Sequence, residues 1–351
     1  MSLSRYIRKC YNFALGTSIP VLALFYADSS LRAAISRFTE QRELQLLYSQ
    51  SFQKALSDGQ SSSCFVFNAI ANEIEDQLPL HLIVQKLRKS RSSDQDGEEK
   101  LSLWNELKLQ SVVRLLTTLS VMAECNVLTK TSLTILGRKN FCLNASRKYD
   151  ATFNNNTFRE DSVEDPAILM GIVYILVKKQ LPFLVEQVSS SVHRLFESIS
   201  PTDIMKTDDV YALLEGAVSD LSLYYSFQFS KDREEILAEI SKKYVVTGGI
   251  LQLLDELEDF ITETDAKIII SHQIQLLLSH LKTFLPSGSE EGFRLAKMLS
   301  FFTKFNNTIT ELPIKESFFE SVSHDSHTRA FASIIYSSFD EEYSAVKDST
   351  I

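Results

Sequence analysis

Residues that end helices and make tight turns are scarce in this chain. It contains 10 Gly and 7 Pro among 351 residues. Folds rich in β-structure need many tight turns, and those turns depend on these two residue types. The scarcity therefore predicts long helices joined by few breaks. Because 44% of the residues are hydrophobic, such helices can bury a sizeable core, and we expect an all-α fold.

Apolar residues recur at helical spacing along most of the chain. We predict helices over residues 31–56, about 61–78, 81–89, 101–143, 207–226, 231–243, 250–283, 289–305 and 314–345. Asp58-Gly59 and Pro79 are expected to end helices. The polar stretches 90–99 and 148–164 are expected to be loops.

One uncharged run in the middle of the chain, residues 166–177, is too short to span a bilayer and predicts a buried core helix. Pro182 and Pro201 follow it and are expected to interrupt helical structure.

The N-terminal region contains a longer uncharged run, residues 10–27, preceded by Arg5, Arg8 and Lys9. Its 18 residues lie near the lower limit of the ~17–25 that cross a bilayer as a helix. We predict a membrane anchor that contacts the lipid bilayer through residues 10–27. A secretory signal peptide and a buried core helix are the alternatives; the first lacks a clean small-x-small cleavage site. Residues 1–30 would then form the anchor, and residues 31–351 one elongated helical bundle.

The sequence contains none of the common catalytic or cofactor-binding motifs. Neither a phosphate-binding glycine pattern nor a GxSxG elbow occurs. His324 and His327 could meet on one helix face, but no third metal ligand is indicated, so a solvated pair is expected. The net charge of -9 disfavours binding to a phosphate backbone. We expect no enzyme activity, cofactor, metal site, nucleic-acid partner or small-molecule substrate.

Four cysteines occur without any CxxC pair, which favours a reducing compartment: Cys10, Cys64, Cys125 and Cys142.

The segment from Lys100 to Leu143 resembles the most recognisable block of the peroxin-3 family. It begins KLSLWNELK, continues as a long apolar helix, and reaches a Leu-x-Ile-Leu-Gly stretch at 133–137 that we expect to form a turn. Residues 82–89 resemble the family's Leu/Lys-rich helix that precedes the tryptophan. Residues 331–339 resemble its C-terminal aromatic helix.

This resemblance implies a single-pass protein of the peroxisomal membrane, reached directly or by way of the endoplasmic reticulum, with its helical domain in the cytosol. The implied partner is peroxin-19, the soluble receptor and chaperone for peroxisomal membrane proteins, whose N-terminal amphipathic helix docks in a groove of peroxin-3. The groove residues carry over to Trp104, Lys100 and Leu107 from the motif, and to Leu87 on the preceding helix.

A count of ~100° per residue gives an independent view of Trp104. Trp104 projects about 120° from the centre of the apolar stripe, and Lys100 and Lys108 would flank it. An aromatic residue between two cations suits an apolar partner helix with acidic edges. Alternatively, Trp104 caps the core against the preceding helix. The stripe consists of Leu109, Val112, Val113 and Leu116.

Two rival functions remain open from the sequence. The first is a membrane tether for organelle inheritance or selective autophagy that uses the same fold with another partner. The second is a soluble helical scaffold.

Overall fold

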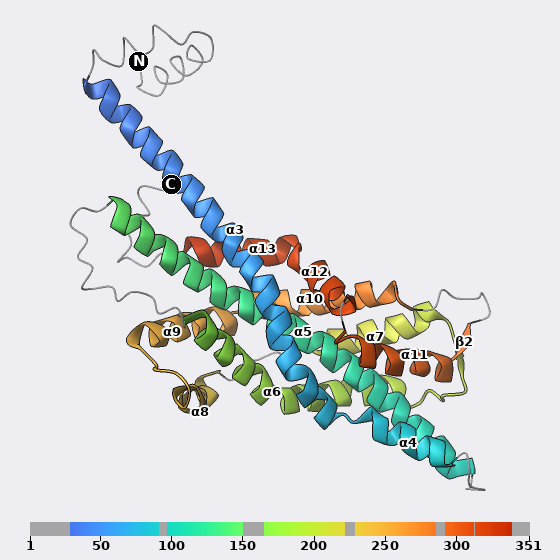
Figure 1. The fold of residues 1–351 in the computed structure, drawn as a ribbon. Coiled ribbons are helices and arrows are strands. Elements are labelled where there is room, and N and C mark those ends of the chain that lie inside the picture. The colour runs from blue at the N-terminus through green and yellow to red at the C-terminus, as the bar shows by residue number, and fades with distance from the viewer. Residues whose placement is uncertain are drawn as a thin grey trace, which may run out of the picture. The chain divides into compact units, whose positions relative to one another are not determined.

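The computed structural model describes residues 29–90, 97–149, 165–221, 229–285, 292–311 and 313–338. This part of the chain forms eleven helices and a two-stranded ribbon (Figure 1). The all-α prediction is confirmed, and the ribbon is an addition. The helices are α3 (Ser29–Gln77), α4 (Leu80–Ser90), α5 (Gly97–Tyr149), α6 (Asp165–Phe196), α7 (Thr207–Leu221), α8 (Phe229–Ser241), α9 (Gly248–Thr262), α10 (Thr264–Lys282), α11 (Leu295–Thr308), α12 (Ile314–Ser323) and α13 (Ser326–Ser337). Strands β1 (Ile204–Met205) and β2 (Phe293–Arg294) pair antiparallel.

The chain divides into two compact units. Unit 1 comprises Met1–Ser51, Phe141–Phe153 and Phe339–Ile351, and unit 2 comprises Phe52–Asn140 and Asn154–Ser338. The predicted anchor, residues 10–27, lies outside the described residues. Its separation from a helical domain at residue 30 therefore stays a prediction.

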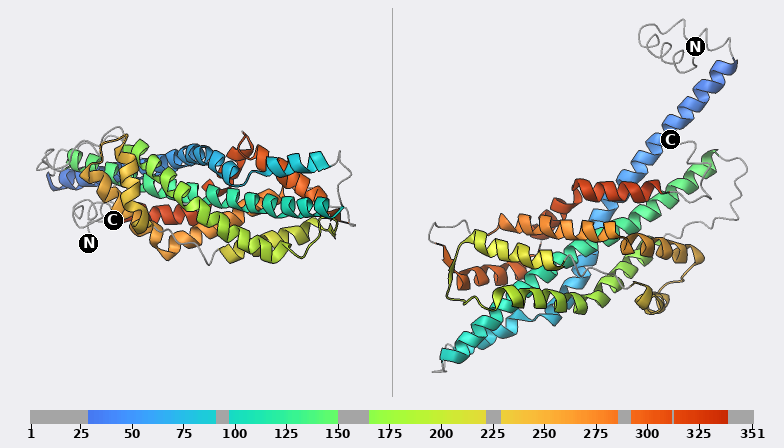
Figure 2. Two further views of the ribbon diagram at one scale, coloured as in Figure 1. Left: turned by 90° about the horizontal axis from the view of Figure 1, so that it is seen from below. Right: turned by 180° about the vertical axis from the view of Figure 1, so that it is seen from behind.

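Helix α5 is the centre of unit 2. Every residue from 111 to 136 is buried, so this part of the helix is enclosed on all sides rather than along one stripe. Figure 2 (left) shows α5 between α3 and α4 on one side and α6 and α7 on the other. Helix α10 packs against α7, α9, α12 and α13, and α6 packs against α7 and α8.

The N-terminal part of α6 confirms the predicted core helix over residues 166–177. Its buried residues are Ile168, Leu169, Ile172, Val173, Leu176 and Val177.

Two glycines that suggested a break or a turn lie inside continuous helices instead. The predicted break at Gly59 is wrong because α3 runs through it, and the predicted turn at Gly137 is wrong because α5 continues to Tyr149. A Cβ atom at Gly59 would lie 2.9 Å from Cγ of Lys130, and one at Gly137 would lie 2.9 Å from Cβ of Ala55. These glycines therefore allow α3 and α5 to approach closely.

We expect the change Gly137→Val to lower the free energy of unfolding by about 1–3 kcal/mol, the usual cost of overpacking a core. Chemical denaturation measures this loss. Gly97→Val is the matched control, because a Cβ atom at Gly97 meets nothing within 4 Å. Equal stability of the two variants would contradict the close-packing role of Gly137.

The predicted interruption at Pro182 is also wrong, since α6 runs through it. A proline inside a helix leaves the carbonyl four residues earlier without its backbone donor. That carbonyl belongs to Lys178, and both Lys178 and Pro182 are exposed. Water can therefore satisfy the freed carbonyl, which lowers the cost of the proline. Pro79 does separate two helices, α3 and α4, as predicted.

Two helices expected to be single are each divided in the structure. The predicted helix 250–283 is interrupted at Glu263, whose backbone is extended. The predicted helix 314–345 is interrupted before Asp325, which caps α13 by accepting a hydrogen bond from the backbone of Thr328. Asp is a preferred N-cap residue, so this second break had a sequence signal. Residues 150–164 of the predicted loop 148–164 lie outside the described residues.

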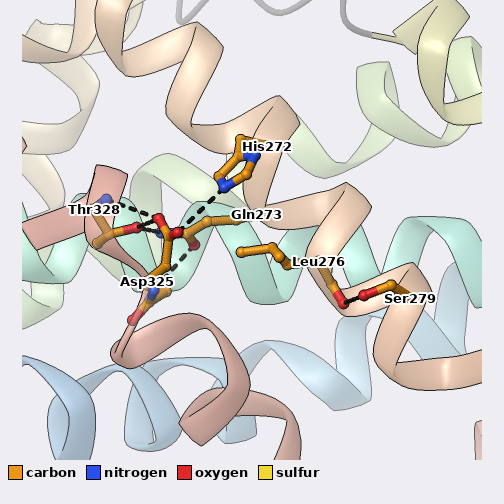
Figure 3. A network of polar contacts seen from close by, with 7 residues as sticks. His272, Gln273, Leu276, Ser279, Asp325 and Thr328 are labelled. Atoms are coloured by element: carbon orange, nitrogen blue, oxygen red, sulfur yellow. Dashed lines mark hydrogen bonds and ion pairs between the residues drawn. The ribbon is translucent and has the colours of Figure 1, made fainter. Parts of the chain in front are cut away.

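A chain of buried and half-buried polar contacts joins α5, α10 and α13, and Figure 3 shows its part between His272, Gln273, Asp325 and Thr328. Asn126 donates to Gln273 at 3.0 Å, and Gln273 donates to the Thr328 hydroxyl at 2.8 Å. The Thr328 hydroxyl donates in turn to Asp325 at 2.9 Å, and Nε2 of His272 lies 3.2 Å from the same carboxylate. Burial by itself would raise the pKa of Asp325, but the bonds from Thr328 and His272 outweigh it and lower that pKa.

Lys130 on α5 is a buried cation near this polar chain. Its ammonium group donates to the carbonyl of Ser323 at 3.3 Å. Burial lowers the pKa of Lys130 to about 8, although Asp325 opposes this effect. The folded-state pKa thus lies below the value of 10.5 for an unperturbed lysine.

This pKa shift predicts how stability depends on pH. Between pH 8 and 10.5 the unfolded chain holds a proton on Lys130 that the folded chain has released, so stability rises with pH in this window. Across this pH window we expect the free energy of unfolding of the wild type to rise by on the order of 3 kcal/mol relative to that of Lys130→Met, because each unit of pKa shift corresponds to 1.36 kcal/mol. Urea denaturation of both proteins at pH 7, 9 and 10.5 tests this; a constant difference between them would contradict the shift.

Candidate functional site

Helix α4 presents one apolar face to the start of α5. The buried residues Leu80, Ile83 and Leu87 recur at spacings of three and four, the pattern of an amphipathic helix. They form a small cluster with Leu107 of α5, separate from the main core. Trp104, one turn before Leu107, is half-buried and packs against this cluster.

A groove of about 580 Å³ opens over this cluster. Helix α4 forms one wall, the start of α5 forms the floor, and α11 forms the second wall. Trp104 and Leu107 come from the floor, and Leu87 from the first wall. The full lining consists of Leu80, His81, Val84, Gln85, Leu87, Arg88, Trp104, Leu107, Ser300, Thr303, Lys304 and Asn307.

The two charged residues that line the groove are both cations. Arg88 lies on α4 and Lys304 on α11, and His81 of α4 lies 3.8 Å from Glu75, which is outside the lining. None of the lining residues that the structure describes is acidic. An apolar floor between basic walls suits an amphipathic helix whose polar edge carries carboxylates.

The structure brings together three of the five residues that the sequence singled out, namely Trp104, Leu107 and Leu87. Lys100 is exposed one turn before Trp104, beside the groove rather than in its lining. The alternative that Trp104 caps the core against the preceding helix agrees in part with the structure, because its ring packs against the buried cluster on α4 and also lines the groove.

Lys108 requires a correction. We expected it to flank Trp104 at the surface, but it is fully buried. Its ammonium group donates to the carbonyls of Phe196, at 2.7 Å, and Ile199, at 2.5 Å. A buried cation needs such acceptors. Phe196 is the last residue of α6 and Ile199 follows three residues later, and the helix dipole also favours positive charge at this end. Burial lowers the pKa of Lys108, while Asp203 and Glu197 oppose that shift.

The α11 wall was missed from the sequence. Thr303 and Lys304 lie about 200 residues beyond Trp104, and no motif in this region links them to it. The additional α4 residues did carry a signal. His81, Val84 and Arg88 continue the helical face of Leu80 and Leu87 with spacings of three and four.

The histidines and cysteines do not form a second chemical site in the part of the chain described here. His327 lies against His272, with ring centroids 4.7 Å apart, rather than pairing with His324. Among the described residues, no three His, Cys, Asp or Glu side chains are placed to hold a metal ion. Burial raises the pKa of the Cys125 thiol well above its usual value, so this cysteine stays protonated and unreactive.

Two described helical segments are long and apolar enough to span a membrane by length and composition. They are Gly97–Ala145, whose most apolar window is entirely buried, and Pro166–Phe196, whose window is 44% buried. Buried core helices meet the same criteria. Both segments contribute many residues to the core cluster, and we assign them to the core.

A family model of known proteins matches the segment that contains α4 and α5, the helices that form the first wall and the floor of the groove. The family model described as Peroxin-3 matches residues 27–165, which include α3, α4 and α5. An uncharacterized protein of Schizosaccharomyces pombe is 42% identical over 335 residues, or 95% of this chain and 96% of that protein. Peroxisome biogenesis protein 3-1 of Arabidopsis thaliana is 20% identical over 275 residues, or 76% of each chain. The chain belongs to the peroxin-3 family.

Proposed function

We propose that this protein acts in peroxisome biogenesis as a membrane docking protein for cargo-loaded peroxin-19. The groove at Trp104 is the observation that carries the proposal, because it places three of the residues implied by the family resemblance on one open apolar surface. The name of the Arabidopsis thaliana relative supports the biological process. Docking would bring membrane proteins bound to peroxin-19 to the site of their insertion.

The dimensions of the groove suit a short stretch of helix. Its α4 wall extends from Leu80 to Arg88, which is about 12 Å at 1.5 Å per residue. A partner helix lying along this wall would contact it over roughly two turns. Apolar side chains at positions i, i+3 or i+4, and i+7 of the partner would meet Trp104, Leu107 and Leu87.

The basic residues would orient the partner. Arg88 and Lys304 lie on opposite walls, so carboxylates on both edges of a partner helix would find a cation. Lys100 is exposed and would add long-range attraction that speeds association and weakens in high salt.

The same proposal places the protein in the peroxisomal membrane. Residues 10–27 would anchor it, and the helical domain with the groove would face the cytosol, where peroxin-19 is found. The uncharged run behind Arg5, Arg8 and Lys9 supports the anchor.

Capture of peroxin-19 tests this function. The full-length chain, purified in detergent and immobilised, should retain full-length peroxin-19 in a one-to-one ratio. An excess of a synthetic peptide of the N-terminal peroxin-19 helix should release it, because both would occupy the groove. A chain that retains no peroxin-19 would contradict the proposal and leave the membrane tether as the stronger candidate.

A further inference from the structure

The α11 wall of the groove is attached to α5 by buried polar contacts. Asn306 of α11 donates from Nδ2 to the backbone carbonyl of Ser111 at 3.1 Å. The hydroxyl groups of Ser111 and Thr303 lie 3.3 Å apart. Asn306 and Ser111 are both buried, whereas Thr303 is half-buried and lines the groove. We call Ser111, Thr303 and Asn306 the α11 clamp.

The hydrogen-bond direction within the clamp follows from the neighbouring contact. The Thr303 hydroxyl donates its single proton to the carbonyl of Leu299 at 2.9 Å. Its oxygen must therefore accept from the Ser111 hydroxyl. Ser111 thus holds α11 at two points, as an acceptor through its carbonyl and as a donor through its side chain.

Two directional contacts fix more than the distance between the helices. Apolar packing of buried α11 residues such as Met298 and Phe302 stabilises the contact with the core, but such packing has no strong directional preference. Hydrogen bonds weaken steeply when their geometry changes. The clamp therefore also fixes the rotation of α11, and with it the positions of Thr303 and Lys304 in the groove wall.

We propose that the α11 clamp sets the width and shape of the groove, so that Ser111 and Asn306 are positioning residues for the partner helix. Neither residue lines the groove. The inference rests on the proposed function and extends it, because it makes binding depend on side chains that never touch the partner.

Calorimetric titration of the synthetic peroxin-19 helix into full-length variants tests the clamp. Asn306→Leu keeps the approximate volume and removes the donor, and it should weaken binding at least roughly fivefold, the equivalent of one buried hydrogen bond. Thr303→Val keeps the shape and removes the hydroxyl, and it should also weaken binding. Thr303→Ser keeps the hydroxyl and should bind within roughly twofold of the wild type. Ser111→Ala removes the hydroxyl on the α5 side of the clamp, outside the groove lining, and should also weaken binding; it decides the question if Asn306→Leu does not fold.

Gln273→Leu is the matched control for general destabilisation. It removes a buried amide that bonds to Asn126 and Thr328, about 22 Å along α5 from Ser111. It should lower the melting temperature and leave affinity unchanged.

Three results would overturn the clamp: wild-type affinity in both Asn306→Leu and Ser111→Ala, a loss in Thr303→Ser without a loss in Thr303→Val, or an equal loss in Gln273→Leu. Wild-type affinity in Trp104→Ala would instead overturn the proposed groove function, so the two failures are distinguishable.

Discussion

The change Trp104→Ala is expected to weaken binding of the peroxin-19 helix by roughly thirtyfold or more. Central tryptophans of an interface commonly contribute about 2 kcal/mol or more when truncated, and ~1.4 kcal/mol corresponds to tenfold in affinity. Trp104 would occupy such a position in the proposed complex, because its ring packs against the apolar cluster on α4 and lines the groove. Calorimetric titration of the wild type and the variant measures the loss.

The fold should survive this change. Truncation of a fully buried Trp costs about 3–5 kcal/mol of stability. Because Trp104 is only half-buried, its truncation should lower the stability by well under that amount. Phe183→Ala is a suitable control, since Phe183 is an exposed aromatic residue on α6 outside the groove. Unchanged affinity would remove Trp104 from the site. A large fall in melting temperature together with lost binding would show that Trp104 acts mainly as a core residue.

Deletion of residues 1–30 should release the chain from membranes completely. The full-length protein should stay in the membrane pellet after alkaline carbonate extraction, because residues 10–27 form an uncharged run long enough to cross the hydrocarbon core. The shortened chain, residues 31–351, should appear in the supernatant.

The shortened chain should also keep a strongly helical far-UV circular dichroism spectrum, because the buried core cluster lies between Val66 and Ile335, far from the deleted segment in the sequence. Release of the full-length protein by carbonate would contradict the anchor and favour the soluble scaffold. A loss of helical signal in the shortened chain would show that the segment supports the fold.

The floor and one wall of the groove could be predicted because the family resemblance implied Leu87, Trp104 and Leu107 as groove residues. The helical count independently placed only Trp104, away from the centre of the apolar stripe of α5. Thr303 and Lys304 could not be predicted, because their contact with α5 depends on how the chain folds back after about 200 residues. Tertiary contacts of this kind leave no periodic signal in a single sequence.

Lys108 and the two glycines show why residue type alone misleads. A lysine on a helix is usually solvated, yet Lys108 is buried because the carbonyls of Phe196 and Ile199 receive its protons. Glycine usually indicates a turn, yet Gly59 and Gly137 allow two long helices to touch. In each case the deciding partner belongs to another helix, and only the folded chain identifies it.

Fluorescence of Trp104 tests the central claim most directly. It is the sole tryptophan of the chain, so its emission reports on the groove without any mutation. Titration of the full-length protein with a tryptophan-free peptide of the N-terminal peroxin-19 helix should shift the emission to shorter wavelength, as apolar side chains replace water around the ring, and the shift should saturate at one peptide per chain. An emission spectrum that stays unchanged while the peptide binds would contradict docking at the groove.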